Sequence, residues 1–178
     1  ANEGNAVALA AGYHMSTGKI GAVYMQNSGL GNTINPLTSL TDPEVYKIPL
    51  LMIIGWRGEP GVKDEPQHIK QGKIQLELLE TMNIAYVIIS KDDKNYSSKI
   101  LNAITTAKNE NRPVVLLMRK GAFEKYGTTI PKVKTHQMLR EEALEIIMNH
   151  LDKNAIIVST TGKTSREIYE IREKRGQS

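Results

Sequence analysis

Short apolar runs recur along the first two thirds of the chain, and stretches with a helical spacing of apolar residues separate them. The apolar runs cover residues 20–25, 50–55, 85–89 and 114–118. The helical stretches cover residues 1–16, 70–82 and 97–110. Nearly continuous apolar runs of this length are typical of strands buried on both faces of a parallel sheet. Strands that alternate with helices predict an α/β fold in which helices flank a parallel sheet.

Two polar segments interrupt this alternation. Residues 26–35 are rich in Gly and Asn and are interpreted as a loop that leads into a helical turn at 36–40. Residues 56–68 contain two glycines and two prolines and predict a second, longer loop. Because long loops inside compact domains more often carry function than not, the second loop is a candidate site.

The pattern changes after residue 119. Residues 120–136 have mixed charge, Gly-anchored turns and Pro131 without a clear period, which indicates a linker. Beyond it we expect a helix over 137–150, a strand over 155–159 and a helix over 165–174. The sequence therefore predicts a first domain at 1–119, a linker at 120–136 and the beginning of a second α/β unit at 137–178.

Composition excludes several classes of protein. The chain has 178 residues, a formal net charge of +4 and no Cys. The lack of Cys excludes a disulfide framework, a thiol nucleophile and a Cys-ligated metal, and it agrees with the cytoplasmic location that we expect. The mild charge and the few aromatic residues argue against nucleic-acid binding. No apolar stretch approaches the roughly 20 residues that a membrane span needs, so we expect no membrane partner.

The first residues suggest a piece of a larger protein. The chain opens without Met, and helical patterning begins within three residues. Asn2 is placed to cap this helix, and Glu3 lies in its first turn, where the helix dipole favours an anion. By itself Glu3 is a capping acid. The Gly-rich segment that follows the next strand nevertheless brings a second set of polar groups to the sheet edge where ligands bind in parallel α/β folds.

Two further motifs have ordinary explanations. Gly162-Lys163-Thr164 resembles the end of a phosphate-binding P-loop, but the required Gly five residues earlier is Ile157. The alternative interpretation, a βα turn whose backbone amides bind an anion at the start of the helix, remains open. The four histidines lack the spacing of metal ligands. Of these, His68 ends the long loop and is the one candidate for function.

Three segments resemble the thiamine-diphosphate-dependent decarboxylases, in particular the phosphonopyruvate decarboxylase family and its sulfopyruvate-decarboxylating kin. They are Ala1-Asn2-Glu3-Gly4-Asn5-Ala6, Asn27-Ser28-Gly29-Leu30-Gly31-Asn32 and Gly55-Trp56-Arg57-Gly58-Glu59-Pro60-Gly61. Residues 63–68 and 160–167 fit the same family. The resemblance implies that residues 1–119 are a pyrimidine-binding domain without its N-terminal part, and that residues 137–178 begin a diphosphate-binding domain.

The resemblance also implies a cofactor, thiamine diphosphate, and residues that hold it. Glu3 matches the glutamate that hydrogen-bonds N1′ of the aminopyrimidine, which promotes loss of the thiazolium C2 proton. The residues beside the pyrimidine would be Asn27, Ser28, Gly29, Leu30 and Asn32. The residues near the diphosphate would be Thr161, Gly162 and Thr164.

The substrate implied by the resemblance is 3-phosphonopyruvate, which would yield phosphonoacetaldehyde and CO2. Gln67 and His68 match positions where related decarboxylases place polar active-site residues, and we expect His68 to contact the substrate or relay a proton. Arg57 and Lys63 would face the phosphonate, because a dianion calls for cations.

The family holds Mg²⁺ through a Gly-Asp-Gly motif that this chain does not contain. We therefore assign no metal ligand here, and we expect the chain alone to be a catalytically inactive fragment. Family sites form between subunits, so the resemblance implies self-association into a dimer or a larger oligomer. Two alternatives stay open: a sulfopyruvate or other 2-oxo-acid decarboxylase, and a non-catalytic scaffold subunit in which Glu3 is dispensable.

Overall fold

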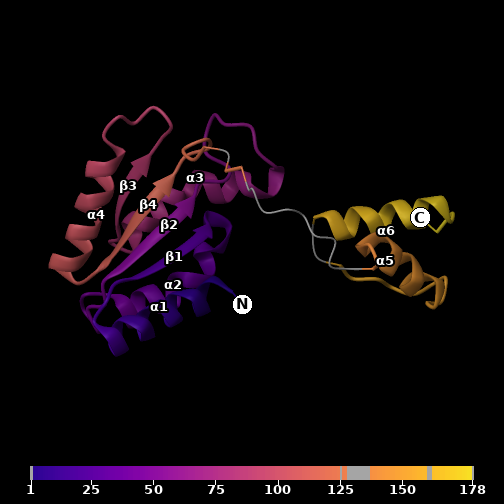
Figure 1. Ribbon diagram of the computed structural model, residues 1–178, viewed down its shortest axis with the longest axis horizontal. Helices are drawn as coiled ribbons and strands as arrows, with labels where there is room; N and C mark the ends of the chain where they lie inside the picture. Colours follow the sequence, from indigo (N-terminus) through magenta and orange to yellow (C-terminus); the bar gives the residue numbers. More distant parts are fainter. Residues whose placement is uncertain (1, 125, 128–136, 160–161, 178) are drawn as a thin grey trace. The chain divides into compact units, whose positions relative to one another are not determined.

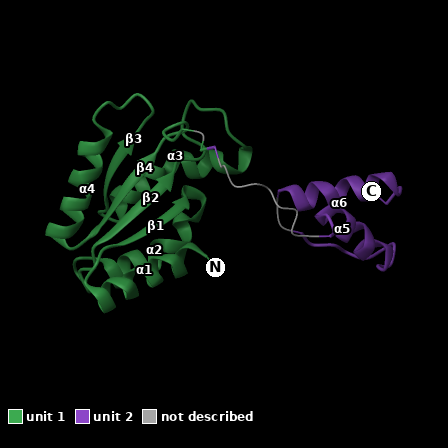
Figure 2. Cartoon of the chain, in the orientation of Figure 1, with its two compact units in different colours: residues 1–126 green, residues 127–178 purple. Residues whose placement is uncertain are grey.

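The computed structural model describes residues 2–124, 126–127, 137–159 and 162–177. The chain divides into two compact units, residues 1–126 and residues 127–178, which Figure 2 shows in different colours. Most of the expected linker at 120–136 lies outside the described residues.

The first unit is built on a four-stranded sheet in which every neighbouring pair is parallel (Figure 1). Its strands are β1 (Gly21–Gln26), β2 (Leu50–Gly55), β3 (Ala85–Ile89) and β4 (Pro113–Met118). Their spatial order is β1-β2-β4-β3. The α/β class and the four predicted strands are confirmed, each strand to within one residue.

The register of the sheet places three strand ends level with one another. Gln26 pairs with Gly55, and Gly55 pairs in turn with Met118. Because these strands are parallel, the segments that follow β1, β2 and β4 all leave the sheet at one edge. Loops that are far apart in the sequence therefore meet there, which is where open α/β sheets bind ligands.

Helices cover the two faces of the sheet with separate hydrophobic clusters. α1 (Glu3–Thr17) and α3 (Pro66–Thr81) contribute to the larger cluster, where Val7 and Leu79 are fully buried. α4 (Tyr96–Glu110) covers the other face. Its cluster contains Ile89, Ala103, Ala107, Val114, Leu116 and Met118. Each large apolar side chain buried in this way contributes about 1.5–3 kcal/mol relative to exposure.

The ends of α1 follow the capping signals in the sequence. The Asn2 side chain accepts a hydrogen bond from Asn5 N at 3.0 Å. At the other end, Gly18 adopts a left-handed conformation with φ 69°. Both caps confirm the sequence-based prediction, and they fix the position of Glu3 as the first helical residue.

The segment after β1 is more regular than we expected. Residues 27–33 form a 3₁₀ helix, η1 (Asn27–Thr33), followed by α2 (Ile34–Pro36) and the π-helical turn η2 (Leu37–Thr41). The prediction of a loop at 26–35 was therefore wrong. The Thr33 hydroxyl donates to Leu30 O at 2.7 Å, and such local bonds hold a Gly- and Asn-rich sequence in tight turns.

The helix after the second loop begins earlier than predicted. α3 starts at Pro66 rather than at Lys70, so Gln67 and His68 lie in its first turn and not in a loop. The physical reason is that Pro fits the first helical position, where no backbone N–H is needed and φ is already helical. Pro66 therefore marks the start of the helix and not part of the loop predicted at 56–68.

The second unit contains two helices in its described residues, α5 (Arg140–Asn149) and α6 (Lys163–Lys174). A two-point ion pair joins them, with Arg140 Nε 2.7 Å from Glu167 Oε2. The strand expected at 155–159 is absent: the backbone there is irregular, and Ile156 and Val158 are more than 90% exposed. An apolar run becomes a strand only against a partner strand, and the described residues of this unit supply none.

No described helix is both long enough and apolar enough to cross a membrane.

Candidate functional site

Glu3 is the first of the predicted site residues, and α1 presents it to the segment after β1. Its Oε2 accepts a hydrogen bond from Asn32 Nδ2 at 2.9 Å. This bond is the main cause that lowers the pKa of the Glu3 carboxyl from its ordinary value. The side chain is half-buried, and among the described residues Oε1 has no side-chain partner. The carboxylate is thus oriented from one side and keeps room for another donor.

Gly29 provides the space that Glu3 occupies. A Cβ at this position would lie 2.2 Å from Glu3 Cγ and 2.5 Å from Glu3 Oε1. Any larger residue would therefore push the carboxylate away from Asn32. The structure brings together three residues that the sequence analysis assigned to the cofactor: Glu3, Gly29 and Asn32.

The other three residues of that group have different positions. Asn27 is buried, and its side-chain amide bonds both backbone groups of Arg57, with Nδ2 2.8 Å from the carbonyl and Oδ1 2.9 Å from the N–H. The Leu30 side chain packs in the larger hydrophobic cluster. Ser28 is exposed, and its carbonyl accepts from Gln71 at 3.5 Å. A cofactor contact for these three stays a prediction.

A compact ionic cluster occupies the segment between β2 and α3. Arg57 binds the carboxylate of Asp64 through two bonds, Nε to Oδ2 at 2.8 Å and Nη2 to Oδ1 at 2.6 Å. The backbone N–H groups of Gly58 and Glu65 donate to the same carboxylate at 2.8 and 2.7 Å. With Arg57 as the largest cause, these donors hold the pKa of Asp64 well below its usual range.

His68 joins this cluster from α3. Its Nδ1 lies 3.1 Å from Asp64 Oδ1, and both side chains are about 13–14% exposed. The sequence analysis included Asp64 only within residues 63–68 and gave it no role of its own. The available signal was local: an Asp four residues before a His, directly ahead of a helix that starts with Pro.

The remaining predicted substrate residues adjoin this cluster in the sequence, and within the described part of the chain their side chains form no hydrogen bond or ion pair with it. Gln67 and Lys63 are both exposed. The Lys63 carbonyl accepts a weak bond from Lys120 Nζ at 3.4 Å. A role for Gln67 and Lys63 in substrate binding stays a prediction.

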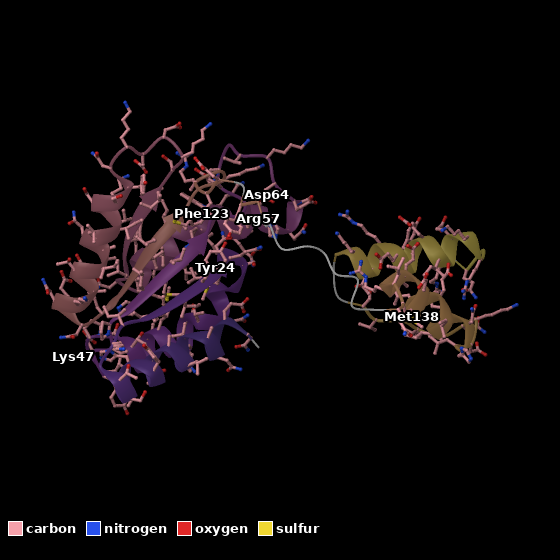
Figure 3. All side chains as sticks on the ribbon, viewed as in Figure 1. Tyr24, Lys47, Arg57, Asp64, Phe123 and Met138 are labelled. Carbon is pink, nitrogen blue, oxygen red and sulfur yellow. The ribbon has the colours of Figure 1, made fainter. Side chains whose placement is uncertain are left out.

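A cavity of about 260 Å³ opens beside Arg57 and Asp64 at the ends of β2 and β4. Figure 3 labels four of its lining residues, which are Tyr24, Arg57, Asp64 and Phe123. Arg119 and Lys120 also line it, although the sequence analysis named neither. Arg119 is anchored by the buried Glu59 at 2.6 Å. The cavity thus combines three cations with apolar walls and excludes the predicted Lys63 side chain from its lining.

The residues expected near the diphosphate belong to the second unit. Gly162 precedes α6 with φ 114°, and its carbonyl accepts from the Ser165 hydroxyl at 2.9 Å. Thr164 lies in the first turn of α6. Thr161 lies outside the described residues. Within the described parts of the chain, no three His, Asp or Glu side chains are grouped as metal ligands would be.

Comparison with known proteins connects this geometry to a family. Residues 1–86 match the family described as "Thiamine pyrophosphate enzyme, N-terminal TPP binding domain". A phosphonopyruvate decarboxylase of Streptomyces viridochromogenes is 36% identical over 97% of this chain and 46% of its own length. A second one, from Streptomyces hygroscopicus, is 33% identical over the same shares.

A further relative is the sulfopyruvate decarboxylase subunit alpha of Methanococcus maripaludis, which is 42% identical over 57% of this chain and 58% of its own length. The chain spans about half the length of the relatives that it matches. The parallel α/β fold agrees with these matches. Residues 1–86 match the N-terminal TPP-binding domain of the thiamine pyrophosphate enzymes, and the chain is similar along most of its length to phosphonopyruvate decarboxylases and, over a shorter stretch, to a sulfopyruvate decarboxylase subunit.

Proposed function

We propose that this chain supplies the pyrimidine-binding side of a thiamine-diphosphate-dependent decarboxylase that converts 3-phosphonopyruvate to phosphonoacetaldehyde and CO2. The observation that carries the proposal is the Glu3 carboxylate, which Asn32 holds in place beside Gly29, where any Cβ would displace it. The matches to phosphonopyruvate decarboxylases along 97% of the chain support the substrate.

The residues around Glu3 fit the aminopyrimidine end of the cofactor. Oε1 has no side-chain partner among the described residues, so Glu3 can share a proton with a ring nitrogen. When bound, thiamine diphosphate supplies the centre that accepts the electron pair left behind by CO2. The lowered pKa of Glu3 keeps its carboxylate ionised at neutral pH, the form that stabilises a protonated pyrimidine.

The cationic cavity fits the charged end of the substrate. Arg57 and Arg119 each use one edge of the guanidinium on a carboxylate and retain N–H groups for a second anion. A phosphonate and a sulfonate are both recognised by such groups. Arg57 is the residue of this cavity that was expected from the sequence, and Lys63 would approach from outside it.

The proposal also covers where Mg²⁺ is bound and how subunits assemble. The chain contains no Gly-Asp-Gly motif, so Mg²⁺ and most of the diphosphate would be held by the other half of the enzyme. That half would come from the same polypeptide or from a second subunit, in line with relatives named "subunit alpha". We propose a cytoplasmic oligomer with its site between subunits.

The test is CO2 release from 3-phosphonopyruvate by the complete holoenzyme, measured with and without thiamine diphosphate and Mg²⁺. Glu3→Gln should lower kcat by at least a hundredfold, because a neutral amide lacks the negative charge that stabilises a protonated N1′. Glu44→Gln, an exposed acid of the same domain, is the matched control and should leave the rate unchanged.

Competition with sulfopyruvate identifies the substrate. If CO2 is released from sulfopyruvate alone, the substrate is the sulfonate and not the phosphonate, and the proposed role of Glu3 is unchanged. Cofactor binding without CO2 release from either acid would reject the decarboxylase and favour a scaffold subunit.

A further inference from the structure

Asp64 is the most heavily bonded side chain of the first unit's described part, and its donors determine its own protonation. Two N–H groups of Arg57 and the backbone N–H groups of Gly58 and Glu65 point at its two oxygens. A carboxylate that receives four N–H donors and lies beside a guanidinium is ionised at neutral pH. It can only accept hydrogen bonds.

The ionised state of Asp64 determines which ring nitrogen of His68 carries hydrogen. Because Asp64 Oδ1 cannot donate, the 3.1 Å contact with His68 Nδ1 is a hydrogen bond only when Nδ1 carries the proton. In the neutral ring the other nitrogen, Nε2, is then the unprotonated one. Nε2 has no hydrogen-bond partner among the described residues and stays available to water or a ligand.

The backbone around the pair is held rigidly. Gly58 and Gly72 allow the loop to touch α3 directly, since a Cβ on Gly72 would lie 1.8 Å from Gly58 O. The Trp56 indole N–H donates to Gly72 O at 3.0 Å and closes the same contact. Asp64 and His68 are four residues apart across the start of α3, so their approach does not depend on a flexible segment.

We propose that Asp64 is a positioning residue, which holds His68 as the Nδ1–H tautomer and leaves Nε2 as the atom that exchanges protons with the substrate. This rests on the proposed function, in which a carboxylate on carbon is replaced by hydrogen. One proton from solvent must therefore reach that carbon. His68 Nε2 takes this proton from water and delivers it, and Asp64 stabilises the charged ring in between.

The first test needs no cofactor. Long-range ¹H–¹⁵N spectra of the histidine-labelled chain, recorded near pH 8.5 where free imidazole is neutral, report which ring nitrogen carries hydrogen. His68→Gln assigns the signal among the four histidines. We expect the Nδ1–H tautomer. A ring with hydrogen on Nε2 in the unaltered chain would overturn the proposal by itself.

Variants separate orientation from general stability. Asp64→Ala should shift the His68 signal to the Nε2–H tautomer, which predominates in free histidine. Arg57→Gln removes the other partner of Asp64 and should leave the Nδ1–H tautomer in place, as should Glu65→Ala, the adjacent exposed acid. An Asp64→Ala chain that keeps Nδ1–H would contradict the proposal. If Asp64→Ala unfolds, the His68 tautomer measured in the unaltered chain and in Arg57→Gln still tests the proposal.

The second test uses the holoenzyme. Asp64→Ala should lower kcat about tenfold or more because proton transfer is impaired, and Arg57→Gln, which removes the cation but keeps Asp64, should act mainly on KM. Glu65→Ala should retain full activity. If Glu3→Gln abolishes turnover while Asp64→Ala does not change kcat, the result supports the proposed decarboxylase function and contradicts the positioning role of Asp64.

Discussion

Glu3 and Asp64 are both carboxylates beside strands that end level at one edge of the sheet, yet the protein binds them very differently. Glu3 receives one side-chain donor, Asn32. Asp64 receives two bonds from Arg57, two from backbone amides and one from His68. A carboxylate with one side-chain donor is oriented but can still accept a hydrogen bond from a ligand, whereas one with five donors is fully used in binding neighbouring residues. Glu3 is therefore suited to meet a ligand, and Asp64 to position other residues.

The glycines beside the two carboxylates show the same difference. The Cβ of a substituted Gly29 would meet the Glu3 side chain from Cγ outward, and this side chain can adopt another rotamer. In the Asp64 loop, the Cβ of a substituted Gly72 would meet backbone atoms that cannot. Substitution at the first position should damage the site, and substitution at the second should damage the fold.

The largest effect is expected for Gly72→Ala. Its Cβ would lie 1.8 Å from Gly58 O, so the loop and α3 must separate, and we expect the free energy of unfolding to fall by about 3 kcal/mol. Urea denaturation measures this. Gly12→Ala is the matched control, since that helical glycine has open space around it and should gain about 0.5–1 kcal/mol. Equal unfolding midpoints for the two variants would refute the rigid contact.

Gly29→Ala should have the opposite effect, a large loss of activity with little loss of stability. The new Cβ displaces the Glu3 carboxylate from Asn32, and we expect kcat of the holoenzyme to fall about a hundredfold. Because only a partly exposed side chain moves, the free energy of unfolding should change by less than about 1 kcal/mol. Gly31→Ala lies in the same 3₁₀ helix with nothing near its Cβ and should behave like the unaltered enzyme. A stable, fully active Gly29→Ala enzyme would remove Glu3 from the mechanism.

The smallest effect is expected in the pH dependence of stability. A carboxyl whose pKa is lowered on folding stabilises the protein above its unfolded pKa, and this stability is lost as pH falls through the folded value. Asp64→Asn should therefore lower Tm at pH 7 and flatten its decline below about pH 5. Glu3→Gln should change the acid decline less, because the pKa of Glu3 is lowered mainly by one side-chain hydrogen bond, from Asn32, whereas Arg57 and backbone amides together lower that of Asp64. Calorimetry at several pH values would contradict the comparison if both variants gave the same curve.

Several features of the fold follow from local sequence, and these were predicted well. The four strands agree with their apolar runs to within one residue, and Asn2 and Gly18 cap α1 as expected. The family resemblance was confirmed by the matches to the thiamine pyrophosphate enzymes. The predicted strand at 155–159 failed because a strand depends on a partner elsewhere in the chain, which no local pattern reveals.

The candidate site depends on both levels. The sequence by itself determined the strands, the helix that begins at Glu3 and the resemblance that predicts a role for Glu3, because periodicity, capping and motifs are properties of neighbouring residues. Only the tertiary structure decided that Gly29 makes room for Glu3, that Asn27 ties two strand ends together and that Asp64 links Arg57 to His68. Those contacts arise because parallel strands end at one edge and bring distant loops within hydrogen-bond distance.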